Sequence, residues 1–368
     1  MEFLNVKAFA SESDETRDLC EAIKKYSAEV IKERKGINAF ADHTKDEMKT
    51  LINKQFAAVV AKKSGIALPS ENATKMEVQR YAELPMVKAF AEQTRNIMID
   101  AIIPDLLIES PLQYIADIQF ADLGDTVKFD IKSNQLLTVS KAGNRQRNTN
   151  VQKTFMSDVT LSGEAREITL QTNLYDILVG RSFIAEEIMK AGLAIENDML
   201  DSAYDAFVAA MNALTGSALA VANYSEKSLI TLCERIGAYN NATPIILGTP
   251  VALKNLLPDN TNYRYFLDSD YVKLGHVNVF NTYDVIPMAQ KANPYSATKY
   301  DLKFDDTKLY VVTPATDKLV KMAIFGGTMS RQNEADEAAN LSVLHTIYTN
   351  YGVEVITNSL AGIVEDIH

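Results

Sequence analysis

Apolar positions in the first hundred residues recur at the spacing of α-helices. One apolar stripe in residues 17–36 has intervals of four, three and four residues, which place its members on one helical face, and Gly36 then supplies a stop. The members of the stripe are Leu19, Ile23, Tyr26 and Val30. A second helix is predicted from Lys45 to Lys63, ending at Ser64 and Gly65. Because the stripe is shorter than the about three heptads of a coiled coil, it predicts ordinary packing within a mostly helical region.

The period changes to two beyond residue 126. Val127, Phe129 and Ile131 alternate with polar neighbours, which is the pattern of a β-strand with one buried face. The alternation resumes with Val159 and Leu161. Turn-forming residues lie between the two runs, namely Gly143, Asn144, Asn148 and Asn150. This order predicts a long hairpin that becomes polar on both faces towards its tip.

A helical period returns after the hairpin and predicts the longest helix of the chain. The helix runs from about Asp176 to Leu214 and is interrupted only by Gly180 and Gly192. Its apolar positions are Ile184, Ile188, Ile195, Met199, Phe207 and Met211. At ~1.5 Å per residue, about 30 helical residues span roughly 45 Å, which suggests a spine for an elongated molecule.

Short helices and strands alternate in residues 215–325. The clearest unit is a strand from Pro244 to Leu247, followed by a Thr249 cap and by Pro250 at the first helical position. Further strands are predicted within residues 276–290 and 308–327, and the chain closes with two β-rich runs separated at residues 350–352. The chain as a whole therefore predicts a mixed α and β protein.

Length and composition set broad limits on the class of protein. A chain of 368 residues exceeds the ~250 to 300 at which one core stops growing, so two or more sub-structures are expected. Cys20 and Cys233 have no paired spacing, which predicts neither disulfides nor zinc and favours a reducing, cytosolic origin. A formal charge of −11 argues against broad nonspecific affinity for nucleic acid. No apolar run approaches the ~18 residues of a membrane span, and we expect no secretory signal.

The sequence contains no motif of catalysis or cofactor binding. The patterns G-x-x-x-x-G-K, G-x-G-x-x-G, H-E-x-x-H and G-x-S-x-G do not occur. The histidines are scattered without metal-ligand spacing, and they are His43, His276, His345 and His368. We expect His345 and Cys233 to be packed core residues. Solvated loop carboxylates are favoured over a calcium site at Asp268, Asp270, Asp305 and Asp306. No catalytic residue, cofactor or metal site is predicted.

The tip of the predicted hairpin is basic in an otherwise acidic chain. No Asp or Glu occurs from Ile131 to Ser157, and the cations of the tip are Lys141, Arg145, Arg147 and Lys153. A nucleic-acid grip would interleave aromatic residues for stacking, but Phe155 is the only one. A phosphate site would carry more than one glycine and lead into a helix. The remaining interpretation is a projecting arm that meets an acidic surface, and another copy of this acidic chain is an available partner.

The order of these elements resembles that of the major capsid protein of tailed bacteriophages, the shell fold also seen in encapsulins. The resembling order is a helical arm, a two-stranded loop from Phe120 to about Leu170, a spine helix, a mixed α/β lobe and a return to a peripheral sheet. The closing segment carries the closest likeness, with an acidic turn, a long peripheral strand and a short strand that re-enters the axial domain. Those three parts are Asn333–Asn340, Leu341–Ile356 and Ala361–Val364. The likeness covers roughly residues 107–368.

The resemblance implies an α+β fold and a structural, non-enzymatic role. It implies self-assembly into the icosahedral capsid of a phage virion around double-stranded DNA, with the protein made and assembled in the bacterial host cytoplasm. The implied partners are other copies of this chain in hexamers and pentamers, and possible further partners are portal, scaffold or decoration proteins. The resemblance implies neither membrane binding nor sequence-specific binding of nucleic acid. The basic residues listed above would form the tip of the extended loop, which in this family lies over a neighbouring subunit. Some relatives crosslink through a loop lysine, but no partner motif for Lys141 or Lys153 is present and no crosslink is predicted.

The resemblance also divides the chain into segments with different roles. The first is a helical arm or scaffold-like extension (1–106), followed by the entry to the peripheral domain (107–119), the extended loop (120–172), the peripheral domain with the spine helix (173–214), the axial domain (215–325), the return strands of the peripheral domain (326–356) and a C-terminal axial segment (357–368). In some relatives a protease removes a first segment of similar length. The presence of Met1 in this chain favours retention.

A second hypothesis comes from a different class of protein. The chain would be a cytosolic α/β enzyme or small-ligand-binding protein with a pocket in residues 243–290, where the strand-Gly-Thr-Pro-helix unit could point backbone N–H groups at an anion. Against this, the unit occurs once, without the second strand-helix repeat that forms a crevice in open α/β sheets. The particle mass separates the two hypotheses, because a shell has a mass of megadaltons and a pocket protein of tens of kilodaltons.

Overall fold

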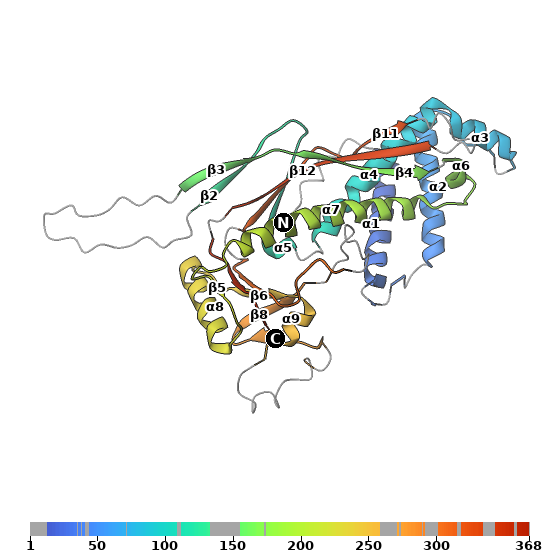
Figure 1. Cartoon of the computed structure of the whole chain (residues 1–368). Helices are drawn as coiled ribbons and strands as arrows, with labels where there is room; N and C mark the ends of the chain where they lie inside the picture. The colour runs from blue at the N-terminus through green and yellow to red at the C-terminus, as the bar shows by residue number, and fades with distance from the viewer. Residues whose placement is uncertain are drawn as a thin grey trace.

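The computed structural model has the predicted α+β fold. It describes residues 13–34, 36–37, 39–40, 44–70, 72–108, 112–132, 155–172, 174–257, 271, 274–288, 290, 301–314, 318–333, 343–356 and 359–367. These residues form a larger lobe of helices and a five-stranded sheet, and a smaller lobe around a six-stranded sheet. A two-stranded ribbon extends away from the larger lobe (Figure 1).

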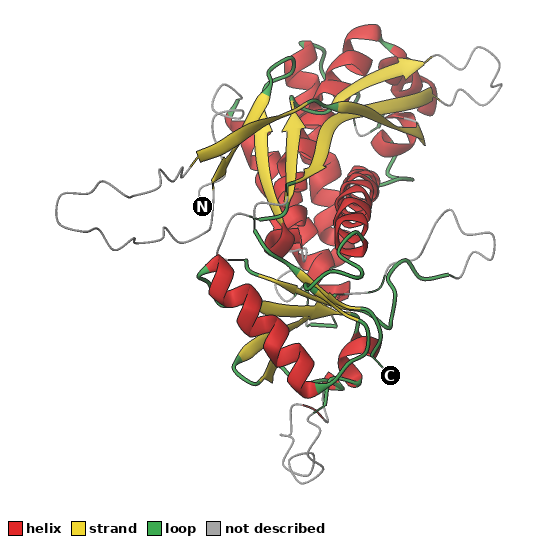
Figure 2. Ribbon diagram, turned by 60° about the vertical axis from the view of Figure 1, so that its left-hand side comes forward, coloured by secondary structure: helices red, strands yellow, loops and turns green. Residues whose placement is uncertain are grey.

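The N-terminal helices belong to the main core of the larger lobe. The helices of this lobe are α1 (Asp14–Arg34), α2 (Lys45–Ser64), α3 (Lys75–Glu83), α4 (Pro85–Ile108), α5 (Leu112–Ile115), α6 (Leu174–Leu178) and α7 (Ile184–Asn212). Helices α1, α2 and α4 all pack against α7, and Figure 2 shows this bundle of helices behind the strands of the larger lobe. The predicted stripe on α1 is buried in the same core as α7, which confirms that interpretation.

The ends of α2 follow from local sequence, as predicted. The Thr44 hydroxyl accepts a hydrogen bond from the Glu47 N–H, and the Glu47 carboxylate accepts one from the Thr44 N–H, which together form a capping box. At the other end Gly65 has a φ of 69°, in the left-handed region that favours glycine. The helix therefore begins and ends where its flanking residues predict.

The long helix begins later than the sequence pattern predicted. The chain first forms the short helix α6, then turns, and α7 begins only at Ile184. The reason is Gly180, which has a φ of 78°. After this glycine, the N–H groups of Arg181 and Ser182 donate hydrogen bonds back to the carbonyl of Asp176. Gly192, in contrast, lies inside α7, where a Cβ atom would come within 2.6 Å of the Ile102 side chain. One glycine ends a helix, and the other lets two helices approach closely.

One long strand, β12 (Val343–Val355), organises the five-stranded sheet. Strand β4 (Glu164–Thr172) pairs with one side of β12, while β11 (Met329–Asn333) and β10 (Val320–Phe325) pair with the other side. Strand β1 (Ala116–Ala121) pairs in parallel with β10. The predicted separation into two runs at residues 350–352 is wrong, because β4 pairs with β12 as far as Tyr351 and β10 pairs with it from there onwards. The single long strand expected from the resemblance is confirmed.

The ribbon consists of β2 (Val127–Lys132) and β3 (Phe155–Leu161) in antiparallel register. Val127 and Phe129 are buried, whereas Lys128 and Asp130 are exposed, so the predicted alternation is confirmed for these positions. The exposed Lys128 pairs across the ribbon with Asp158 at 3.6 Å. One face of the ribbon root therefore packs against the sheet and the other faces solvent.

The smaller lobe contains the strands that come late in the chain. Its strands are β5 (Ala220–Val221), β6 (Ile245–Gly248), β7 (Val279–Phe280), β8 (Tyr283–Pro287), β9 (Leu309–Val312) and β13 (Gly362–Val364), in the order β5-β13-β9-β6-β8-β7. Helices α8 (Glu226–Asn240) and α9 (Pro250–Lys254) cover this sheet (Figure 2). Thr249 accepts a hydrogen bond from the N–H of Ala252, and Pro250 is the first residue of α9, as predicted. The C-terminal strand β13 also joins this sheet, between β5 and β9.

The two lobes share one core along α7. The ring of Phe207 on α7 meets that of Tyr310 on β9 edge to face, with 5.2 Å between the ring centroids. Lys303, which precedes β9, lies 3.1 Å from the carboxylate of Asp201 on α7. Among the helices that the structure describes, none has the length and apolar character needed to cross a membrane.

Candidate assembly surfaces

The four predicted contact residues of the loop tip lie outside the described residues. They are Lys141, Arg145, Arg147 and Lys153, within residues 133–154. The structure does place both ends of this segment, because Lys132 and Phe155 are register partners at the far end of the ribbon. The two described strands on either side of this segment therefore end next to each other.

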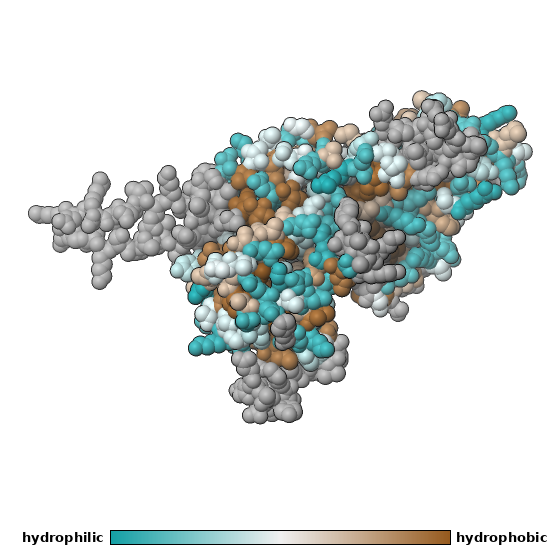
Figure 3. Space-filling model, in the orientation of Figure 1, coloured by the Kyte–Doolittle hydropathy of each residue, from teal (hydrophilic) through white to brown (hydrophobic). Residues whose placement is uncertain are grey.

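A small apolar cluster holds the root of the ribbon. It is separate from the main core and consists of Val127, Phe129, Leu161, Ala323, Phe325 and Ile356. Two close approaches hold the ribbon against the sheet: a Cβ atom on Gly163 would meet the Phe325 ring at 2.7 Å, and one on Gly352 would meet the Ser162 carbonyl oxygen at 2.3 Å. Hydrophobic residues gather at this junction on the face shown in Figure 3. Within the described part of the chain, these contacts fix the ribbon at its root.

A buried lysine lies beneath the ribbon root. Lys321 is 1% exposed, on the face of β10 turned towards the ribbon. Its Nζ atom lies 3.2 Å from the carboxylate of Asp117 and 5.5 Å from the centre of the Phe129 ring. A buried cation needs such partners, because burial without them is costly. The sequence reasoning missed this residue, although a single lysine inside the apolar run 319–325 was a visible signal.

A polar hollow of about 280 Å³ lies at the foot of the ribbon, between β3, α7 and β12. The Tyr351 hydroxyl donates a hydrogen bond to Asp198, at 2.5 Å, and lies 3.1 Å from the Ser202 hydroxyl. Burial and the bond to Asp198 raise the pKa of Tyr351 above its usual range. Arg166 lies over the Tyr351 ring and pairs with Glu164 at 3.3 Å. These partners satisfy one another and fix β12 to α7.

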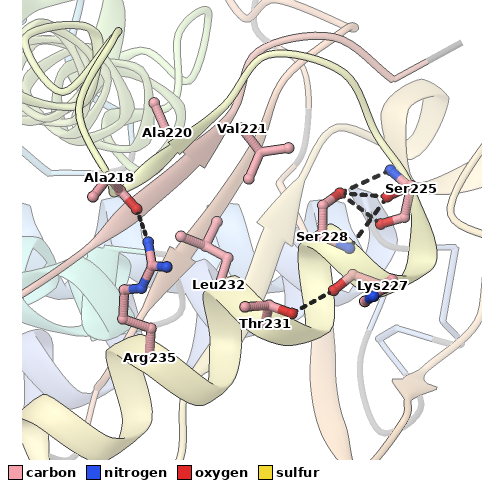
Figure 4. A pocket seen from close by; sticks show the side chains of 9 residues that line it. All are labelled: Ala218, Ala220, Val221, Ser225, Lys227, Ser228, Thr231, Leu232 and Arg235. Atoms are coloured by element: carbon pink, nitrogen blue, oxygen red, sulfur yellow. Dashed lines mark hydrogen bonds between the residues drawn. The ribbon is translucent and has the colours of Figure 1, made fainter.

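A second hollow, of about 550 Å³, lies between α8 and the outer edge of β5 (Figure 4). Its apolar lining is formed by Ala218, Ala220, Val221 and Leu232. Lys227 and Arg235 are its charged lining residues, and the Arg235 guanidinium donates a hydrogen bond to the Ala218 carbonyl (Figure 4). This hollow is a shallow apolar groove with cations at its rim, along an edge strand of the smaller sheet.

The N-terminal helices cap the first turn of α7. The Asn53 side chain on α2 accepts a hydrogen bond from the Ile184 N–H and donates one to the Ser182 carbonyl, both at 2.9 Å. Lys49, one turn earlier on α2, pairs with Glu186 at 2.5 Å, and this hydrogen bond raises the pKa of Lys49. Phe183 stands at the cap position of α7 and supplies no side-chain hydrogen bond, so α2 provides the cap instead. No local pattern could have revealed this long-range cap.

The other predicted site residues have ordinary structural surroundings. Cys233 is fully buried, and burial raises the pKa of its thiol to about 12, which confirms the predicted buried cysteine. The side chain of His345 lies outside the described residues. Asp305 accepts hydrogen bonds from the N–H and hydroxyl of Thr307, a turn interaction. Within the described part of the chain, no group of three or more His, Cys, Asp and Glu side chains is placed to hold a metal ion.

The alternative pocket in residues 243–290 is not supported. Strand β6 of this segment is fully buried, and helix α9 after it has only five residues. Both hollows described above are lined by residues outside the segment. The strand-Gly-Thr-Pro-helix unit therefore serves to pack the smaller lobe.

Comparison with known proteins gives similarity in structure alone. No model of a protein family matches the chain, and no curated protein does. Among solved structures, the chain is similar to the mature capsid of bacteriophage PhiM1, with a TM-score of 0.46 and 12% identity over 70% of this chain and 86% of that one. It is also similar to the capsid of the cyanophage P-SCSP1u, with a TM-score of 0.44 and 14% identity over 70% and 88% of the two chains.

A third similarity is to the virus-like particle from Pyrococcus furiosus, with a TM-score of 0.38 and 11% identity over 73% of this chain and 97% of that one. The descriptions of these three structures name a mature capsid, a capsid and a virus-like particle.

Proposed function

We propose that this chain is a structural protein of the tailed-phage capsid class, which assembles with copies of itself into an icosahedral shell around double-stranded DNA. The observation that carries this proposal is the ribbon β2–β3, which extends from the larger lobe and, among the residues that the structure describes, is packed at its root. An isolated two-stranded hairpin is only marginally stable in water. A ribbon of this kind is useful where a neighbouring molecule completes its packing.

Charge supports a second copy as that neighbour. The segment beyond the described ends of the ribbon carries Lys141, Arg145, Arg147 and Lys153, while the whole chain has a formal charge of −11. A basic tip therefore meets complementary charge on another copy. Many modest contacts of this kind, repeated around a closed shell, add up to a stable assembly. A shell with net negative charge also lets DNA move past it without being held.

The smaller lobe would lie towards the symmetry axes of hexamers and pentamers, and the larger lobe at the periphery. The division of the chain into these domains stays a prediction. Binding to portal, scaffold or decoration proteins also stays a prediction, and so does assembly in the cytoplasm of a bacterial host. The virion capsid is the proposed location. A structural role without catalysis follows from the same assignment.

We also propose that the N-terminal helices remain in the assembled protein. Met98, Ile102 and Leu106 of α4 belong to the main core with α7, and Ile102 packs directly under Gly192. Asn53 on α2 supplies the cap of α7. Removal of this region would expose the core and uncap the spine helix. Intact-mass measurement of purified particles tests this, and a subunit that lacks residues 14–106 would contradict it.

The assembly role is tested on the basic segment. The wild-type chain is expected to sediment as particles of megadalton mass, visible by electron microscopy, and deletion of residues 141–153 is expected to abolish or distort them. A matched variant of full length, with Lys141, Arg145, Arg147 and Lys153 replaced by Gln, separates charge from loop length. Wild-type chain that stays monomeric at every concentration would overturn the proposed function. A deletion variant that assembles like wild type would overturn the role of the segment.

A further inference from the structure

The groove between α8 and β5 runs along a sheet edge that has no strand partner in the described chain. Strand β5 is the terminal strand of the six-stranded sheet and pairs only with β13. The carbonyls of Leu219 and Val221 accept hydrogen bonds from the β13 segment, at 3.0 and 2.8 Å. Backbone groups alternate in direction along an extended chain, so the N–H and the carbonyl of Ala220 both point away from β13. The N–H bonds the Ser217 carbonyl at 3.2 Å, which leaves the Ala220 carbonyl as the acceptor at this edge. An exposed edge of this kind is a template for another strand.

The hydroxyl groups of the groove are already engaged within the chain. Ser225 and Ser228 bond to each other and to their own backbone in the capping box of α8. The Thr231 hydroxyl donates to the Lys227 carbonyl one turn earlier (Figure 4). These groups offer little to a small polar ligand. The recognition elements that remain are the strand edge, the apolar floor and the two cations.

Both charged residues of the groove are cationic, and they are exposed. Lys227 makes no ion pair with any residue that the structure describes. Arg235 bonds the Ala218 carbonyl through one nitrogen, and a guanidinium has further N–H donors for a carboxylate. The two residues are eight positions apart on α8, which is roughly 12 Å along a helix. An extended segment covers that distance in about four residues.

We propose that this groove binds an extended, acidic segment of a second copy of this chain, which adds a strand to the edge of β5. Two carboxylates about four residues apart would reach Lys227 and Arg235, and residues at alternate positions would lie on the apolar floor formed by Ala220, Val221 and Leu232. Strand addition supplies affinity through main-chain hydrogen bonds, and the charges supply specificity. A second copy fits because the chain carries 48 acidic against 37 basic residues. The inference rests on the proposed self-assembly and names one of its contacts.

A photocrosslinker placed in the groove tests this contact directly. The full-length chain carries p-benzoylphenylalanine in place of Thr231, and it is mixed with isotopically heavy chain so that links within and between copies differ in mass. Irradiation is expected to give a dimer whose linked peptide from the second copy carries at least two carboxylates. The same crosslinker in place of Lys254, an exposed residue of α9 in the same lobe, is the control and should give little dimer. Links only within one copy, or equal dimer from both positions, would overturn the inference.

Charge reversal provides an independent measurement. The double variant Lys227→Glu with Arg235→Glu is expected to raise the protein concentration needed for half-maximal assembly by about tenfold. High salt is expected to reverse part of this increase, because it screens the repulsion between the new glutamates and the acidic segment. Lys254→Glu is the matched control and should assemble like wild type. Particles that form normally from the double variant would refute the groove contact and leave the shell function standing. Dimers linked through position 231 in a chain that never forms particles would leave the groove contact standing and refute the shell.

Discussion

Replacing Asn53 with alanine should weaken the start of the long helix α7, although the two lie far apart in sequence. The Asn53 side chain makes two hydrogen bonds of 2.9 Å, one from the Ile184 N–H and one to the Ser182 carbonyl. The cap residue Phe183 makes no side-chain hydrogen bond of its own. Loss of Asn53 therefore leaves the first turn of α7 without the cap that the chain supplies.

The size of the effect follows from these two bonds. Loss of a helix cap costs about 1 kcal/mol, and loss of a further half-buried hydrogen bond costs about another 1 kcal/mol. We therefore expect Asn53→Ala to lower the free energy of unfolding by about 2 kcal/mol. Asn53→Asp keeps the acceptor for the Ile184 N–H but loses the donor to Ser182, so about half of that loss is expected.

Urea unfolding of the full-length chain, followed by far-UV circular dichroism, measures the change. Lys54→Ala is the control, because Lys54 is an exposed neighbour on the same helix and its replacement should change stability by less than about 0.5 kcal/mol. Amide hydrogen exchange should show lost protection at Ile184 in the Asn53→Ala variant, while the middle of α7 is unchanged. Equal stability of the Asn53→Ala and Lys54→Ala variants, with unchanged exchange at Ile184, would show that the cap reasoning is wrong.

Three further predictions concern single residues. Gly352→Ala should lower the free energy of unfolding, measured in urea, by about 2 kcal/mol, because the new Cβ atom would lie 2.3 Å from the Ser162 carbonyl oxygen. A Gly352→Ala variant as stable as the wild type would contradict this close approach. Burial raises the pKa of Asp100 from 3.8 to about 6, so the contribution of its protonated form to the free energy of unfolding is full below pH 4. This contribution, up to about 3 kcal/mol, is lost as the pH rises through 6. Asp100→Asn should flatten this part of the measured pH–stability profile, and an unchanged slope would contradict the reasoning. Cys233 should resist alkylation by iodoacetamide at pH 8 in the native chain and react in urea, because its thiol is buried and burial raises its pKa to about 12. Mass spectrometry measures the labelling, and rapid labelling of the native chain would contradict this prediction.

Much of the local structure could be predicted from periodicity. The apolar stripe of α1 and the alternation of Val127 and Phe129 identified buried faces, because the spacing of apolar residues records which side of an element faces the core. The end of α2 and the start of α9 were predicted from Gly65 and Thr249, whose effects act within one turn. The hairpin, the long helix and the mixed lobe were all expected in the observed order.

The candidate surfaces were predicted only in part. The sequence identified the basic segment between β2 and β3 from its charge, but it did not indicate the groove beside β5. That groove exists because β5 stands at the edge of a sheet whose other strands come from residues 245–364. Arg235 and Lys227 appeared as two ordinary charges of a helix until the sheet edge was placed beside them.

The sequence by itself determined the type and order of the elements, since helix and strand periods, caps and turns depend on residues a few positions apart. Only the tertiary structure decided that β12 runs unbroken past Gly352, that Lys321 is buried beneath the ribbon, and that Asn53 caps a helix that begins at Ile184. Each of these depends on contacts between residues more than a hundred positions apart. Such contacts leave no regular trace in the local pattern, because they are set by how whole elements pack.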